Sequence, residues 1–86
     1  MKDQRNLRVA SVHMEHTDGD KQANFAKIEK FTAAAAAQDA QLVVFPECCV
    51  TGYWFIRNLS AAQLEALAEP VPSGPSTQRL AALATR

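Results

Sequence analysis

The sequence predicts an α/β fold that begins with a strand–helix–strand unit. Two short apolar runs, residues 7–14 and 41–45, flank a segment, residues 21–38, in which apolar side chains recur every three to four positions. The runs are typical of largely buried strands, the second apolar enough to be covered on both faces, and the spacing is typical of an amphipathic helix. Such a unit joins parallel strands by a right-handed crossover.

The segment between the two strands carries its own helix signals. Asp18-Gly19-Asp20 forms a turn and offers two possible N-caps for the helix over residues 21–38. Alanine fills residues 33–37, and alanine is the residue that costs least to hold helical. The apolar stripe predicted to face the core consists of Phe25, Ile28, Phe31 (or Thr32) and Ala35.

The second half of the sequence predicts a loop and two further helices. The loop covers residues 48–58 and turns near Gly52, which we expect to have a positive φ. Ser60 and Gln63 match a capping box, which predicts a short helix. After a connector rich in proline and glycine, Pro75 fits the first turn of a last helix, which we expect to run to the end of the sequence.

Composition and charge exclude several classes of protein. The 86 residues allow one small domain of ordinary composition, and nine basic and nine acidic residues cancel. The basic residues are scattered, which argues against nucleic acid and anionic membranes as partners. We see no secretory signal and no apolar segment long enough for a membrane span. The adjacent Cys48 and Cys49 are poorly placed to bridge each other, and the sequence therefore predicts a reducing, cytoplasmic location.

Glu47 is the first candidate for a functional residue. It follows Pro46, which closes the second predicted strand, and so stands at the carboxyl end of a parallel strand, where open α/β sheets bind their ligands. We expect its carboxylate to be partly desolvated, which favours general-base chemistry near neutral pH. A glutamate at this position can equally cap a helix or pair with an arginine on the surface, and position alone leaves both interpretations open.

The stretch around Glu47 resembles the segment that carries the glutamate of the Glu-Lys-Cys triad in the nitrilase superfamily. The resemblance rests on Phe45-Pro46-Glu47 and Thr51-Gly52-Tyr53 after an apolar strand. It extends to the opening strand RVASVHM, to the helix that carries Asp20, Asn24 and Ile28, and to AEPVPSGPSTQRLAALA. One departure is His13, where relatives often have glutamine. The resemblance implies that residues 1–86 are the N-terminal part of a carbon–nitrogen hydrolase domain. It implies an α-β-β-α sandwich for the complete protein, so this chain would hold an incomplete βαβ portion.

The resemblance also implies an activity. Family members of the amidase or nitrilase type hydrolyse small non-peptide amides or nitriles, and they assemble as dimers or larger homo-oligomers. Glu47 would be the general base for a cysteine thiol, which attacks the substrate and forms a thioester, while a lysine stabilises the tetrahedral species. No metal and no organic cofactor is implied.

Two members of this triad are not found in the sequence. No cysteine follows Cys49, and every lysine precedes Glu47. We therefore expect the 86 residues alone to be inactive, because residues that act as a unit fail together. The alternative to a working hydrolase is an inactive fragment, or a remnant that binds another subunit. A nucleotide-binding module is disfavoured because the first strand-to-helix turn contains one glycine and no glycine-rich loop.

Other residues near Glu47 are weaker candidates. We expect Tyr53 to line the substrate pocket or an interface, and Trp54 and Phe55 to serve in packing. A thiol beside a carboxylate resembles an activated nucleophile, but the preferred interpretation of Cys48 and Cys49 is small apolar residues packed in the loop. The two histidines and two cysteines show no recognised spacing of metal ligands.

Overall fold

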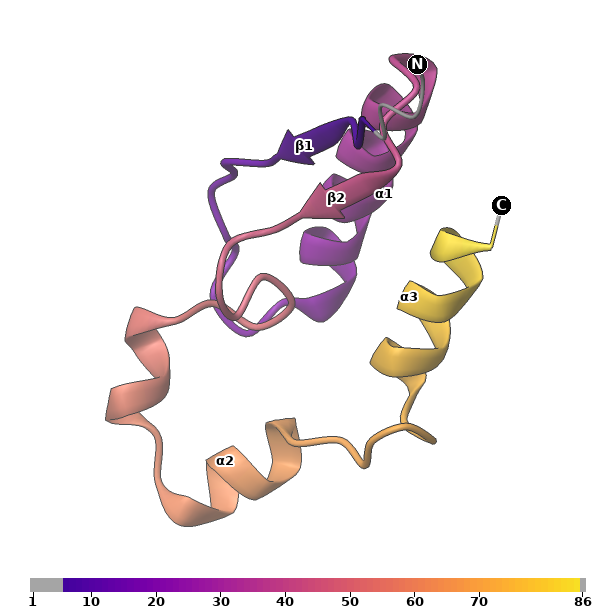
Figure 1. Cartoon of the computed structure of the whole chain (residues 1–86). Helices are drawn as coiled ribbons and strands as arrows, with labels where there is room; N and C mark the ends of the chain where they lie inside the picture. Colours follow the sequence, from indigo (N-terminus) through magenta and orange to yellow (C-terminus); the bar gives the residue numbers. More distant parts are fainter. Residues whose placement is uncertain (1–5, 86) are drawn as a thin grey trace.

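The computed structural model describes residues 6–85 as a strand–helix–strand unit followed by an arc of short helices (Figure 1). The elements, in order, are β1 (Val9–Ser11), α1 (Lys21–Ala37), β2 (Leu42–Val44), the 3₁₀ helix η1 (Trp54–Asn58), α2 (Ala61–Leu67) and α3 (Pro75–Ala84). All of the predicted helices are present, and the strands are shorter than predicted. The 3₁₀ helix lies within the segment that was predicted to be an aromatic loop.

The two strands form a parallel pair, as the sequence predicts. Val9 pairs with Leu42, Ala10 with Val43 and Ser11 with Val44. One further bond, from the Val12 amide to the Val44 carbonyl at 2.8 Å, extends the pairing beyond β1. The carboxyl ends of both strands therefore meet at one edge of the pair.

Helix α1 is closed at both ends by local contacts. The Asp20 carboxylate accepts a hydrogen bond from the Ala23 amide at 3.0 Å, which satisfies one free donor of the first turn. At the other end Asp39 has a left-handed φ of 63°. The amide of Asp39 donates to Ala36 and the amide of Ala40 donates to Ala35, which together form a Schellman motif. This turn returns the chain directly into β2.

The core lies between α1, α3 and the segments that follow the two strands. Phe25, Ile28 and Leu83 are buried, and four partly buried residues pack against them: Met14, Phe45, Cys49 and Val50. Phe25, Ile28 and Ala35 of the predicted stripe are buried, whereas Phe31 and Thr32 are only partly so. Residues from the loops that follow both strands thus belong to the core, and this fixes the loops against α1.

The opposite face of the strand pair is open, which corrects the prediction of buried strands. Val9, Leu42 and Val44 are 49%, 47% and 47% exposed. Side chains alternate between the two faces of a strand, and α1 covers the face that carries Val43 and Phe45. Within residues 6–85 no second layer covers the other face.

The second half of the chain forms an arc that leads away from the strands and returns to α1 (Figure 1). The capping box of α2 is present: Ser60 accepts from the Gln63 amide, and the Gln63 side chain accepts from the Ser60 amide. Yet α2 buries no residue, and of α3 only Leu83 is buried. The radius of gyration is 15.3 Å, against about 12 Å for a compact domain of this length. The arc accounts for the difference.

Polar contacts hold the end of the arc against α1. Lys21 pairs with Glu69, and the Arg79 Nε lies 3.1 Å from a carboxylate oxygen of Glu29. The Arg79 guanidinium also lies over the ring of Phe25, 4.5 Å from its centroid. None of the helices in residues 6–85 combines the length and apolar character that a membrane span needs.

Candidate active site

Glu47 lies just beyond the carboxyl end of β2, where the sequence places it. Its side chain is exposed, so the prediction of partial desolvation is wrong for this chain: no element among residues 6–85 covers this edge. Among the described residues Glu47 takes part in no ion pair and caps no helix. The two structural roles that the sequence left open are therefore not filled within this part of the chain.

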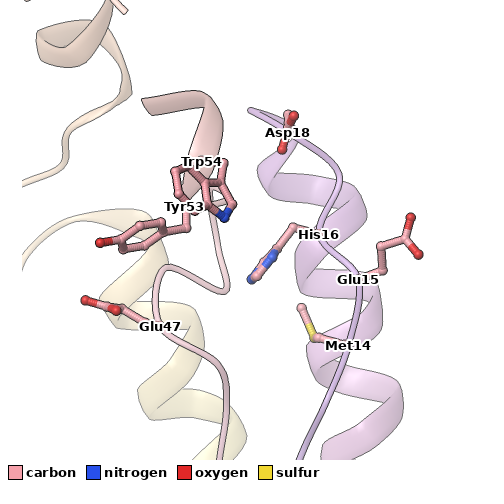
Figure 2. Close-up of a pocket in the computed structure, with 7 residues that line it drawn as sticks. All are labelled: Met14, Glu15, His16, Asp18, Glu47, Tyr53 and Trp54. Atoms are coloured by element: carbon pink, nitrogen blue, oxygen red, sulfur yellow. The ribbon is translucent and has the colours of Figure 1, made fainter. Parts of the chain in front are cut away.

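The Glu47 side chain borders an open groove of about 500 Å³. The loops that follow β1 and β2 form its two sides, together with the start of η1. Figure 2 shows Glu47 and Tyr53 extending in the same direction, whereas Glu15 points away from them. The lining residues are Met14, Glu15, His16, Asp18, Glu47, Tyr53 and Trp54.

The three consecutive aromatic residues have different environments. Tyr53 is 50% exposed and lines the groove. Its contact with substrate stays a prediction. Trp54 is 69% exposed and also lines the groove, which corrects its predicted packing role. The Trp54 ring packs edge-to-face with the Tyr53 ring, and the Arg57 guanidinium lies 4.7 Å from the centroid of the Trp54 ring. Phe55 is partly buried and lies against Gly19 and Gly52, in agreement with its predicted packing role.

Gly52 has the positive φ predicted for it, at 92°. A Cβ atom at this position would lie 3.0 Å from the Asp18 carboxylate and 3.4 Å from the Phe55 ring. Both the backbone conformation and the close approach of Asp18 therefore require glycine. This glycine ends the turn that follows Glu47, because its amide donates to the Cys48 carbonyl at 2.8 Å.

The two cysteines are free thiols in the loop after Glu47. Cys49 packs against the core, and burial raises the pKa of its thiol above the ordinary value, which disfavours the reactive thiolate. Cys48 is partly buried and has a left-handed φ of 56°. These positions agree with the interpretation that both are small residues packed in the loop.

Each of the described lysines already has a partner. Lys21 donates to the Leu67 carbonyl and to Glu69, Lys27 donates to the Glu15 carbonyl, and Lys30 lies over the ring of Phe31. Lys2 lies outside the described residues. Within residues 6–85 no three histidine, cysteine or acidic side chains gather as a metal site would require.

Sequence reasoning missed His16 and Asp18 as lining residues of the groove. They follow β1, and because the carboxyl ends of parallel strands share one edge, the loop after β1 lies beside the loop after β2. The order of the predicted strands is the signal that could have located them. His16 Nε2 is buried and has no hydrogen-bond partner among the described residues. His13 is exposed.

The fold and the site define an α/β chain with a carboxylate at the carboxyl edge of a parallel strand pair. Residues 8–86 match the carbon-nitrogen hydrolase family, and the chain belongs to this family. A nitrilase from Pyrococcus abyssi (strain GE5 / Orsay) is 35% identical to it over 71 residues, which are 83% of this chain and 26% of that protein. The chain thus spans about a quarter of the length of this relative.

Proposed function

We propose that this chain supplies the general base of a carbon–nitrogen hydrolase, and that Glu47 is this base. The complete enzyme hydrolyses a small non-peptide amide or nitrile through a Glu-Lys-Cys triad. The observation that carries the proposal is the position of Glu47 in a chain of this family. Glu47 stands at the carboxyl edge of β1 and β2, beside an open groove. It has no ion-pair partner within residues 6–85.

In each half of the reaction Glu47 accepts one proton and then gives it up. Glu47 takes the proton of a cysteine thiol, and the thiolate forms a bond to the substrate carbon. With an amide, the C–N bond breaks, the amine leaves with the proton, and a thioester remains. Water then gives a proton to Glu47 and attacks the thioester. The C–S bond breaks, the acid leaves, and Glu47 returns the proton to the sulfur, which restores the thiol. A lysine stabilises the negative charge of each tetrahedral species.

The lysine and the cysteine of the triad are assigned to parts of the complete protein outside this chain. Support comes from Lys21, Lys27 and Lys30, each of which already has another partner, and from the buried thiol of Cys49. The open face of Val9, Leu42 and Val44 supports the α-β-β-α sandwich, in which a second sheet covers this face. Assembly as a homo-oligomer and a cytoplasmic location belong to the same proposal.

The second candidate is a remnant without catalysis, which keeps Glu47 but binds another subunit. The exposed apolar face of the strand pair is the feature that favours it. The nucleotide sequence after the codon of Arg86 discriminates the two. An open frame that encodes a later lysine and cysteine supports the hydrolase, whereas a stop codon and a native mass near 9.4 kDa support the remnant.

The direct test is Glu47→Gln in the complete protein, assayed on a panel of small amides and nitriles. Loss of the base is expected to lower kcat by about 10⁴-fold while the thermal midpoint stays unchanged. Glu65→Gln is the matched control, because Glu65 is exposed on α2 and lies outside the groove. A Glu47→Gln variant that keeps more than about a tenth of the wild-type kcat excludes Glu47 as the base.

A further inference from the structure

Asn24 is the one polar residue among the buried residues of the described chain. Its side chain is 0% exposed, in a helix whose other buried residues are apolar. Three hydrogen bonds engage it: Oδ1 accepts from the Thr17 amide at 2.8 Å, and Nδ2 donates to the carbonyls of Thr17 at 2.9 Å and Val50 at 2.7 Å. A buried amide is costly unless it is paired, so this arrangement tolerates little displacement.

The partners of Asn24 belong to the two loops that form the groove. Thr17 lies in the loop after β1, and Val50 lies in the loop after β2. A second bond joins the same loops, from the Gly19 amide to the Thr51 carbonyl at 2.9 Å. Asn24 therefore fixes one loop to the other from within α1, at the edge where the groove opens.

The loop after β2 is a turn that starts directly after Glu47. Cys48 has a left-handed φ, and its carbonyl accepts from the amides of Thr51 at 3.2 Å and Gly52 at 2.8 Å. The carbonyl of Val50, which Asn24 holds, is at the middle of this turn. Any shift of the turn is passed to Glu47 through the peptide bond that joins it to Cys48.

We infer that Asn24 is a positioning residue that sets the place of the Glu47 carboxylate by holding the turn at Val50 against the loop at Thr17. The inference rests on the proposed function of Glu47. Catalysis is sensitive to such placement: a displacement of about 1 Å by a change away from the reacting atoms can cost about 100-fold in rate. The hydrogen bonds of Asn24 would then serve turnover as well as folding.

Asn24→Asp in the complete protein separates the two roles, because it is nearly isosteric. An ionised aspartate still accepts from the Thr17 amide, but it places an acceptor against the carbonyls of Thr17 and Val50. At a temperature where the variant is folded, kcat is expected to fall about 100-fold and KM to change less than about threefold. A crystal structure of the variant should show the turn of residues 48–52 displaced.

Ala35→Gly is the control for loss of stability alone. Ala35 is buried in the last turn of the same helix, away from both loops, and glycine there weakens the helix. This control is expected to lower the thermal midpoint and to keep the wild-type kcat. Asn24→Ser, which retains one hydroxyl donor, is expected to lose about tenfold in kcat and replaces Asn24→Asp if that variant does not fold.

Each outcome decides the inference. The positioning role is overturned if a folded Asn24 variant has a kcat within twofold of the wild type. It is also overturned if Ala35→Gly lowers kcat as much as the Asn24 variant does. Failure of both Asn24 variants to fold, while Ala35→Gly folds, also overturns it and assigns Asn24 to folding. Glu47→Gln is measured alongside. If Glu47→Gln stays active, the proposed function fails. If Glu47→Gln is inactive while Asn24→Asp is fully active, only the positioning role fails.

Discussion

Residues 6–53 and residues 54–85 differ in the contacts that hold them. The first region has two paired strands, a helix with closed ends, and an inner cluster that includes residues of both loops. The second region contributes one buried side chain, Leu83, and is tied to α1 mainly by ion pairs and by Arg79. The candidate base, Glu47, belongs to the first region, and the exposed wall of the groove at Trp54 begins the second.

This difference places the candidate base beside a firmly held turn, whereas the groove wall at Trp54 has fewer buried contacts. Apolar burial and saturated buried hydrogen bonds give large opening free energies, whereas exposed ion pairs give small ones. The turn after Glu47 is held by Asn24 and by the core, so its geometry is fixed. The helices η1 and α2 bury no residue, so the wall that includes Trp54 depends on weaker contacts.

The largest effect is expected from a cavity in the first region. Ile28→Ala removes a fully buried side chain of α1 and is expected to lower the free energy of unfolding by about 2–5 kcal/mol. Leu64→Ala on α2, where the side chain is 40% exposed, is expected to change it by less than about 0.5 kcal/mol. Urea unfolding followed by far-ultraviolet circular dichroism measures both. Equal losses would contradict the division into two regions.

A smaller effect is expected from acid, and it acts on the contact between Glu69 of the second region and Lys21 of the first. Hydrogen bonds from Lys21 and then from Ser76 lower the pKa of Glu69 to about 2. Because the folded-state pKa lies below the ordinary value near 4.5, the stabilisation by Glu69 is fully present above that pH. It is lost as the pH falls toward 2. The amide of Ser76, which donates to Glu69 at 2.7 Å, reports this titration by NMR.

Two variants control the acid experiment. Glu69→Gln should abolish the titration of the Ser76 amide shift. Lys21→Met should move its midpoint up toward the ordinary value, because the hydrogen bond from Lys21 is the largest cause of the shift. A midpoint near 4.5 in the unmodified chain would show that the contact of Glu69 with α1 is not formed in solution.

The elements that sequence reasoning predicted correctly have local signals. Asp20 caps α1, Ser60 and Gln63 form the capping box, and Pro75 begins α3, each through residues within one turn. The parallel pairing followed from the strand–helix–strand order. Glu47 was located by the strand that precedes it and by its motif.

What could not be predicted depends on contacts between residues far apart in the sequence. Asn24 meets Val50 across 26 positions, and no local pattern marks that pair. The face that carries Leu42 was predicted to be covered because its strand is apolar. Apolar content indicates that a strand can be buried, but it does not show whether residues 6–85 supply a layer that covers it. Asp39 takes a left-handed φ where glycine is the usual signal, so its turn was not anticipated.

The central claim, that Glu47 activates the thiol of a carbon–nitrogen hydrolase, is tested most directly by acylation. The complete protein is mixed with a slowly hydrolysed amide substrate, quenched in acid, and its intact mass is recorded over time. The wild type is expected to gain the mass of the acyl group, and Glu47→Gln is expected not to. Acylation of Glu47→Gln at the wild-type rate would contradict the claim.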